Sequence, residues 1–434
     1  MVTAKVIICG KLYQPSTRII LTDQLLYINN DGIIESIVSF SHLTNFHESF
    51  TGYQVIDFRN SFVMPSLIDC HCHPFIYSDN YQENHLRDNS SYKTLRALKA
   101  VQNMLKCGWT TIRICGDADV GQGVNSLKRA IKERIFSGPR IVGAAHYISS
   151  TGGGGDYVLS DEQCCHPDGL IVDGPEHMRK VVREEIKYGS DWIKLLVSGA
   201  FMSSHDSPSD CHFSEEEVIM AVKEAGARNV PVCAHAHSAS SICMSVKAGV
   251  KSIEHGTFLA ENSGIITSMI EKDIYLVPTL YVTDHFINKN DQSNIEDERN
   301  SCLDKLVKLS RRFRQVHFDS TLMTYKAGVK IACGTDNVGW NPSLNVNELI
   351  LLKEAGLEIH DVLRSATSVA AELLNISGIG DLQVGYHADL IVLSKSPFED
   401  FDVIRKPFEM VVFNGEIIRD ANNETSLDSS VIES

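Results

Sequence analysis

Residues that can bind metal ions stand at the ends of several short apolar runs in this sequence. The run LIDCHCHPF places His71 and His73 two positions apart, so both imidazoles point to one side of a strand while Cys72 points to the other. Two imidazoles on one face suit a single metal ion. A buried, hydrogen-bonded pair of histidines is an equal alternative, and the spacing alone does not decide between them.

Three later apolar runs also end in a residue of this kind. His235 ends VPVCAH, His255 ends KSIEH and Asp336 ends KIACGTD. Taken singly, each histidine is more typical of a hydrogen-bonded strand end than of a metal site, and the aspartate is more typical of a helix N-cap. His237 is open to three readings, since it could bind the metal, orient a ligand or contact a substrate. Beside histidines, Asp336 could bind a metal and move protons between water and a leaving group.

Lys194 interrupts the apolar run WIKLLV, where its ammonium group would be buried. An unpaired buried charge is unfavourable, so one alternative is a lysine paired with a buried carboxylate. The other is a neutral amine that has added CO2, because apolar surroundings lower a lysine pKa and leave the amine nucleophilic. The carbamate formed in this way is an anion that can bridge two divalent ions.

Short apolar runs alternate with longer segments of helical period through the middle of the chain. The runs are FVMPSLIDCH, TTIRIC, RIVGAAH, DWIKLLVSG, VPVCAH, KSIEH, IYLVPT and KIACGTD. This alternation over about 300 residues predicts an α/β fold with a (β/α)8 TIM barrel. In such a barrel, functional side chains project from the C-terminal ends of the strands into one mouth, which is where the candidate ligands stand.

The two ends of the chain have a different pattern of short strands and tight turns, such as the Asn-Gly turn in VVFNGEII. We therefore predict that residues 1–62 and 379–434 form a small β-sandwich domain, the second segment including a polar tail. Residues 63–378 would then form the barrel.

Composition excludes several classes of protein. The 434 residues carry a net charge of −15, with 43% hydrophobic and 22% charged residues, which is typical of a globular chain. The acidic balance disfavours a nucleic-acid partner, because phosphate contacts need clustered Lys and Arg. No apolar run approaches the roughly 20 residues of a bilayer span, and the start lacks the apolar core of a signal peptide. With scattered cysteines typical of buried thiols, we expect a cytoplasmic protein with no membrane partner.

The order of the candidate residues resembles that in the amidohydrolase superfamily of metal-dependent hydrolases. This order is a His-x-His pair, a lysine in the fourth strand, two strand-end histidines and an aspartate in the last strand. VMPSLIDCHCH is similar to the family's Pro-Gly-Leu-Ile-Asp-x-His-x-His signature, with Ser66 in place of the glycine, and VGYHADLIVL is similar to its return into the β domain. Four further segments most resemble one branch of the superfamily, which contains Xaa-Pro dipeptidases, related carboxypeptidases and the fungal ochratoxinase. These segments are DWIKLLVSGAFMS, VCAHAHS, SIEHGTF and IACGTDN.

The resemblance implies two divalent metal ions, for which zinc is expected. It assigns His71 and His73 to one ion, carboxylated Lys194 to the bridge, His235 and His255 to the other ion, and Asp336 to the roles of ligand and acid/base catalyst. We also predict substrate contacts from His237, which matches a second histidine of the branch, and from Tyr281. The loop STGGGGDY has Gly154 where relatives often show Gly-His-Gly-Asp, so a substrate contact there is missing or moved.

The implied reaction is hydrolysis of an amide in a small substrate that carries an amino acid, such as an Xaa-Pro dipeptide, an N-acyl amino acid or an ochratoxin-like amide. Two alternatives stay open. One is a cyclic amide hydrolase similar to imidazolonepropionase, whose ligand shell lacks the lysine. The other is a catalytically inactive barrel that serves as a scaffold. We expect a homo-oligomer whose other partner is the small-molecule substrate.

Overall fold

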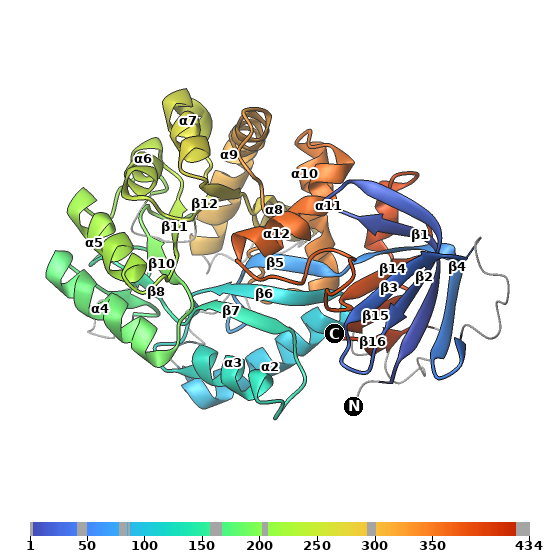
Figure 1. Cartoon of the computed structure of the whole chain (residues 1–434). Helices are drawn as coiled ribbons and strands as arrows, with labels where there is room; N and C mark the ends of the chain where they lie inside the picture. Colours follow the sequence, from blue (N-terminus) through green and yellow to red (C-terminus); the bar gives the residue numbers. More distant parts are fainter. Residues whose placement is uncertain are drawn as a thin grey trace.

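The computed structural model describes residues 3–40, 50–77, 85, 87–156, 167–201, 207–292 and 301–421. Figure 1 shows a β unit, coloured blue and red, that is built from both ends of the chain and lies beside a ring of strands surrounded by helices. The predicted fold class, an α/β barrel with an accompanying β domain, is confirmed. In the described part of the chain, no helix is long and apolar enough to cross a lipid bilayer.

The β unit is a seven-stranded mixed sheet with the order β16-β15-β14-β4-β1-β2-β3. Its strands are β1 (Lys5–Gln14), β2 (Ile19–Ile28), β3 (Ile34–Ser39), β4 (Gln54–Pro65), β14 (Leu390–Leu393), β15 (Met410–Phe413) and β16 (Glu416–Asp420). β4 joins the two ends of the chain, because it pairs in parallel with β1 and antiparallel with β14. A β-sandwich made from both termini was predicted; the described strands from the two termini do belong to one unit, but they form a single seven-stranded sheet.

The predicted boundary between residues 62 and 63 falls inside β4, and residues 422–434 of the predicted tail lie outside the described part. The domain limits therefore stay a prediction.

The barrel strands are parallel and form two hydrogen-bonded groups. The first group is β5 (Leu67–Cys72), β6 (Trp109–Cys115) and β7 (Arg140–Ala144), and the second is β8 (Tyr147–Ser149), β9 (Leu170–Ile171), β10 (Ile193–Leu196), β11 (Val232–Ala236), β12 (Ser252–His255) and β13 (Tyr275–Val277). The run RIVGAAH, predicted as one strand, leads through β7 into the separate short strand β8. A backbone hydrogen bond of 2.8 Å from Asp191 to Gly143 connects the two groups on this side.

The eighth predicted strand, KIACGTD, closes the ring as an irregular segment. Residues 330–337 lie between β13 and β5 and are joined to their neighbours by two isolated parallel bridges, Leu276 with Ile331 and Cys72 with Asn337. Asp336 has a left-handed φ of 53°, which ends the extended geometry at this point. The segment therefore occupies the position of the last strand without forming a regular one.

Helices surround the ring (Figure 1). They are α2 (Ser90–Lys106), α3 (Gly123–Lys132), α4 (Pro175–Tyr188), α5 (Glu215–Gly226), α6 (Ala239–Ala248), α7 (Ser263–Glu271), α8 (Leu280–Gln292), α9 (Ser301–Lys326), α10 (Asn347–Glu354), α11 (Ile359–Ser365) and α12 (Ser368–Leu373), with short 3-10 helices at Leu259–Glu261, Pro342–Val346 and Phe401–Arg405. Local signals explain several of their ends. α5 begins with a capping box between Ser214 and Glu217. α4 starts at Pro175 and is capped at its C-terminal end by Gly189, which has a φ of 108°.

Gly334 lets the closing segment approach β5. A Cβ at this position would lie 2.4 Å from Cγ1 of Val277 and 2.7 Å from Cβ of His71. We expect Gly334→Ala to lower the free energy of unfolding by about 1–3 kcal/mol, because the added methyl group forces the backbone away from a packed core. Urea denaturation measures this change.

Gly226→Ala is a matched control, since a Cβ at Gly226 would meet no heavy atom within 4 Å. This variant is expected to keep or raise stability, by up to about 1 kcal/mol, because alanine favours the helix. Equal unfolding midpoints for the two variants would contradict the close approach at Gly334.

Candidate metal centre

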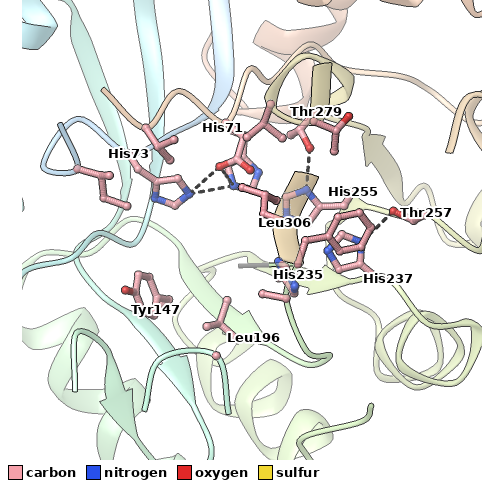
Figure 2. A pocket seen from close by; sticks show the side chains of 18 of the residues that line it. His71, His73, Tyr147, Leu196, His235, His237, His255, Thr257, Thr279 and Leu306 are labelled. Carbon is pink, nitrogen blue, oxygen red and sulfur yellow. Dashed lines mark hydrogen bonds and ion pairs between the residues drawn. The ribbon is translucent and has the colours of Figure 1, made fainter. Parts of the chain in front are cut away.

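The predicted ligands come together in one pocket at the C-terminal ends of the barrel strands (Figure 2). They are His71, His73, Lys194, His235, His255 and Asp336, and all six line the pocket. They come from β5 and the residue that follows it, from β10, β11 and β12, and from the closing segment, which places them on opposite sides of the ring. His237 and Gly154 line the same pocket.

One donor set contains His71, His73 and Asp336. The Nε2 atoms of the two histidines lie 3.2 Å apart, and Oδ1 of Asp336 is 3.1 Å from Nε2 of His73 and 3.5 Å from Nε2 of His71. The Nδ1 atoms point away, with Nδ1 of His71 2.7 Å from the Glu254 carboxylate and Nδ1 of His73 2.7 Å from the Gly116 carbonyl. Because a carbonyl oxygen only accepts, neutral His73 carries its proton on Nδ1 and presents the Nε2 lone pair to the pocket.

A second donor set contains His235, His237 and His255, whose nearest ring nitrogens all lie within 4.8 Å of one another. Nδ1 of His255 is 2.6 Å from the hydroxyl of Thr279, and Nδ1 of His237 is 2.8 Å from that of Thr257 (Figure 2). Burial, reinforced by neighbouring cationic groups, lowers the pKa of all three imidazoles, to about 3 for His235. Neutral imidazoles are the form that binds metal ions.

Lys194 is 2% exposed and lines the pocket together with both donor sets. Within the described ranges, no hydrogen bond or ion pair joins its Nζ atom to another residue. The alternative of a lysine paired with a buried carboxylate therefore finds no support among these residues. An amine in this position is available for another bond.

Asp336 is held in place through its backbone. Its N–H donates to the carbonyl of His71 over 2.7 Å, and the preceding Thr335 donates from its N–H and hydroxyl to the buried Asp69 carboxylate. Burial alone would raise the pKa of Asp336, but the nearby imidazoles of His71 and His73 hold it well below its usual range. The carboxylate is therefore ionised at neutral pH and able to bind a metal ion or accept a proton.

Both donor sets fit a divalent metal ion. Imidazole nitrogens and a carboxylate oxygen are the ligands that zinc and similar borderline ions prefer. In the first set, the proton-bearing nitrogens contact fixed acceptors behind the site, so the lone pairs are directed inward. The buried lysine beside the two sets completes the group of candidate ligands.

The residues that hold the ligands from behind were missed in the sequence. Arg113 interrupts the apolar run TTIRIC in the same way that Lys194 interrupts WIKLLV, so the signal was present but was not used. Glu254 stands inside KSIEH, directly before His255. Thr257 and Thr279 gave no signal, because a hydroxyl near a strand end is common, and its contact with a histidine arises only in the folded barrel.

Tyr281, a predicted substrate contact, is not among the residues that line this pocket. It lies at the start of α8, where its backbone N–H donates to Glu348 over 2.7 Å and its ring packs against Trp340 with 5.3 Å between centroids. Its role in substrate binding stays a prediction.

Comparison with known proteins places this arrangement in a family. The amidohydrolase family matches residues 62–418. Ochratoxinase from Aspergillus niger is 30% identical over 369 residues, which cover 80% of this chain and 72% of that protein. The crystal structure of a Xaa-Pro dipeptidase with bound methionine is similar with a TM-score of 0.84, 29% identity, and coverage of 95% of this chain and 99% of that one. A prolidase complexed with N-methylphosphonate-L-proline has a TM-score of 0.83, 30% identity, and coverage of 96% and 100%. The chain therefore belongs to the amidohydrolase family.

Proposed function

We propose that this amidohydrolase cleaves the amide bond of small substrates that carry an amino acid, using two divalent metal ions, with zinc favoured. The observation that carries the proposal is the convergence of two donor sets and an unpaired, buried Lys194 on one pocket of the described chain. The names of similar proteins, ochratoxinase and Xaa-Pro dipeptidase, support dipeptides and related amides as the substrate class.

The same observation argues against the two alternatives. A hydrolase similar to imidazolonepropionase would have no use for the buried Lys194 in its ligand shell. An inactive scaffold would not need both donor sets to be complete in a single pocket.

In this proposal the metal ions are divided between the two donor sets. His71 and His73 would hold one ion, His235 and His255 the other, and Lys194, carboxylated by CO2, would bridge them, with Asp336 as a further ligand. When bound, the ions supply Lewis-acid activation of the carbonyl group and of water. His237 is left to contact the substrate, and its ring is fixed by the hydroxyl of Thr257 over 2.8 Å.

Asp336 is the proposed proton carrier. As the attacking water oxygen forms a bond to the carbonyl carbon, the Asp336 carboxylate accepts the water proton. As the carbon–nitrogen bond breaks, the same group gives this proton to the leaving nitrogen, and the carboxylate is restored. The low pKa of Asp336 keeps the group in the accepting form before each cycle.

Part of the pocket lining is an apolar wall, which indicates which substrates fit. This wall is formed by Ile76, Leu196, Ala200, Phe201, Val282, Leu306 and Val338. A pocket of this type gains affinity by removing an apolar group from water, while its polar groups orient the reacting bond. The wall therefore favours substrates with an apolar or aromatic group beside the amide.

Replacement of Lys194 tests the proposed bridge. We expect Lys194→Ala to lower bound zinc from about two ions per chain to one or fewer, and to lower kcat/KM by about 100-fold or more, because the bridging anion is lost. Metal analysis by mass spectrometry and a screen of Xaa-Pro dipeptides, other dipeptides and N-acyl amino acids measure both effects.

Lys223→Ala, at an exposed position of α5, is the control and should match the wild type. Because the proposed bridge contains CO2, zinc should restore metal-free wild-type protein more fully when bicarbonate is present. Full activity and two zinc ions in Lys194→Ala would refute the bridge.

Replacement of Asp336 tests the proton carrier. The amide of Asp336→Asn cannot accept a proton, so we expect kcat to fall by about 100-fold to 10,000-fold while the variant stays folded. Asp319→Asn, on the exposed surface of α9, serves as a control for the same chemical change. A normal kcat in Asp336→Asn, with its zinc content unchanged, would exclude Asp336 as the proton carrier.

The apolar wall predicts a preference among substrates. N-acyl amino acids with aromatic side chains should have a kcat/KM at least about 10-fold above those with charged side chains. Leu196→Gln is expected to reduce this ratio, whereas Ile219→Gln, at an exposed residue of α5, is expected to leave it unchanged. Equal kcat/KM values for aromatic and charged substrates in the wild type would show that the wall does not contact the substrate.

A further inference from the structure

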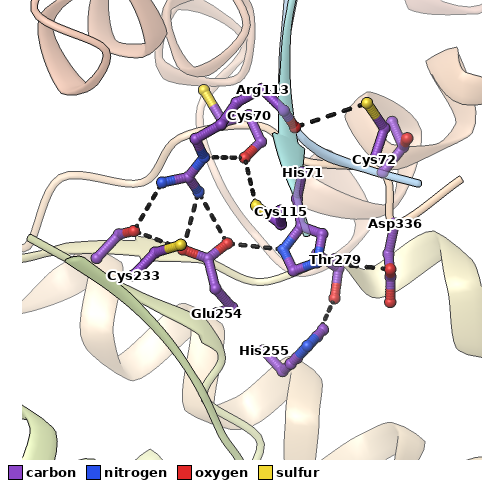
Figure 3. Close-up of polar contacts among 12 residues, drawn as sticks. Cys70, His71, Cys72, Arg113, Cys115, Cys233, Glu254, His255, Thr279 and Asp336 are labelled. Atoms are coloured by element: carbon purple, nitrogen blue, oxygen red, sulfur yellow. Dashed lines mark hydrogen bonds and ion pairs between the residues drawn. The ribbon is translucent and has the colours of Figure 1, made fainter. Parts of the chain in front are cut away.

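A fully buried ion pair lies directly behind His71 inside the barrel (Figure 3). Nη2 of Arg113 is 2.8 Å and 2.9 Å from the two carboxylate oxygens of Glu254, and both side chains are 0% exposed. Nδ1 of His71 lies 2.7 Å from one of these oxygens. A single carboxylate thus contacts the guanidinium on one side and the imidazole of a proposed metal ligand on the other.

Arg113 is itself fixed by several strands. It extends from β6, and its Nε donates to the carbonyl of Cys70 in β5, while Nη1 donates to the hydroxyl of Ser252 in β12 over 3.0 Å. The guanidinium carbon lies 4.5 Å from the ring centre of Trp192. The guanidinium cannot shift without breaking contacts to β5 and β12, so the position of Glu254 is fixed as well.

Stability alone does not explain this pair. Taking two charges out of water is unfavourable, and apolar side chains of the same volume would fill the interior of a barrel at least as well. The carboxylate does provide one property that an apolar group lacks, because it accepts hydrogen bonds and donates none. Opposite Glu254, neutral His71 must carry its proton on Nδ1 and leave the Nε2 lone pair facing the pocket.

His71 differs in this respect from the other proposed ligands. Nδ1 of His73 contacts a backbone carbonyl, which also leaves Nε2 facing the pocket, and Nδ1 of His255 contacts a threonine hydroxyl. Only a carboxylate adds negative charge behind the ring, and that charge makes the Nε2 atom a stronger donor to a metal ion.

We propose that Arg113 and Glu254 are positioning residues that fix the tautomer of His71 and raise the affinity of the metal ion held by His71 and His73. This inference rests on the metal-dependent function proposed above. Arg113 acts through Glu254, which acts through His71, and neither touches the substrate.

The chain offers a matched control for the loss of a buried carboxylate beside a histidine. Nδ1 of His146 lies 2.7 Å from Glu185, and the two side chains are 2% and 3% exposed. This pair is also a buried histidine beside a carboxylate, although Nε2 of His146 contacts the Gly121 carbonyl over 2.6 Å, and neither residue lines the metal pocket. Glu185→Gln therefore measures how replacing a buried carboxylate beside a histidine affects the fold, without altering a contact of the proposed ligands.

The zinc affinity of variants shows whether Arg113 and Glu254 position a metal ligand or only support the fold. We expect Glu254→Gln to bind one of its two zinc ions about 10-fold to 100-fold more weakly than the wild type, measured by competition with a chromophoric chelator. Arg113→Met should show the same loss at the same ion, and Glu185→Gln should keep the wild-type affinity for both. If folded Glu254→Gln holds both ions with wild-type affinity, the inference is overturned while the proposed function stands.

A measurement on the wild type decides the question if the variants do not fold. Nitrogen-15 NMR of the metal-free chain, with the His71 signals identified by their absence in His71→Gln, reports which ring nitrogen carries the proton. A proton on Nδ1 is expected, and a proton on Nε2 would overturn the inference. A wild-type chain that binds no zinc would refute the proposed function, and the tautomer would still be decided.

Discussion

The arrangement of the candidate metal centre depends on the hydrogen-bonded ion pair between Arg113 and Glu254 inside the barrel. All proposed ligands are attached to strand ends, so their separations are set by how the interior beneath them is filled. Arg113 contacts β5 and β12 from β6, and Glu254 extends this contact to His71. Since charges buried in a low dielectric must be paired, these groups tolerate little displacement, and the ring they join is held in one geometry.

Two of the proposed ligands have strained backbone conformations. His255 and Asp336 both have left-handed φ angles, 70° and 53°, which are unfavourable for residues other than glycine. Each is held by hydrogen bonds to a neighbouring element. His317 of α9 donates from Nε2 to the carbonyl of His255 over 2.9 Å, and the N–H of Asp336 donates to the carbonyl of His71 over 2.7 Å. The surrounding structure thus imposes turns that direct these two side chains into the pocket.

The charge on Lys194 affects every imidazole around it. As an ammonium group it adds to the effect of burial and lowers the pKa of His71 and of His235. In the proposed carboxylated form, the same side chain would carry a negative charge and would attract metal ions to the imidazoles instead of opposing them. Beside the apolar wall of the pocket, such charges interact more strongly than they would in water.

The sequence by itself determined the barrel, the strand ends that carry the candidate ligands, and the common direction of His71 and His73. These features follow from local periodicity, because alternation along a strand fixes the side to which each residue points. Only the tertiary structure decided that the eighth strand is irregular, that the ring of Tyr281 packs against Trp340, and that Glu254 lies behind His71. His71 and Glu254 are 183 positions apart in the chain. Their contact depends on how the strands close into a ring, so it cannot be predicted from the spacing of neighbouring residues in the sequence.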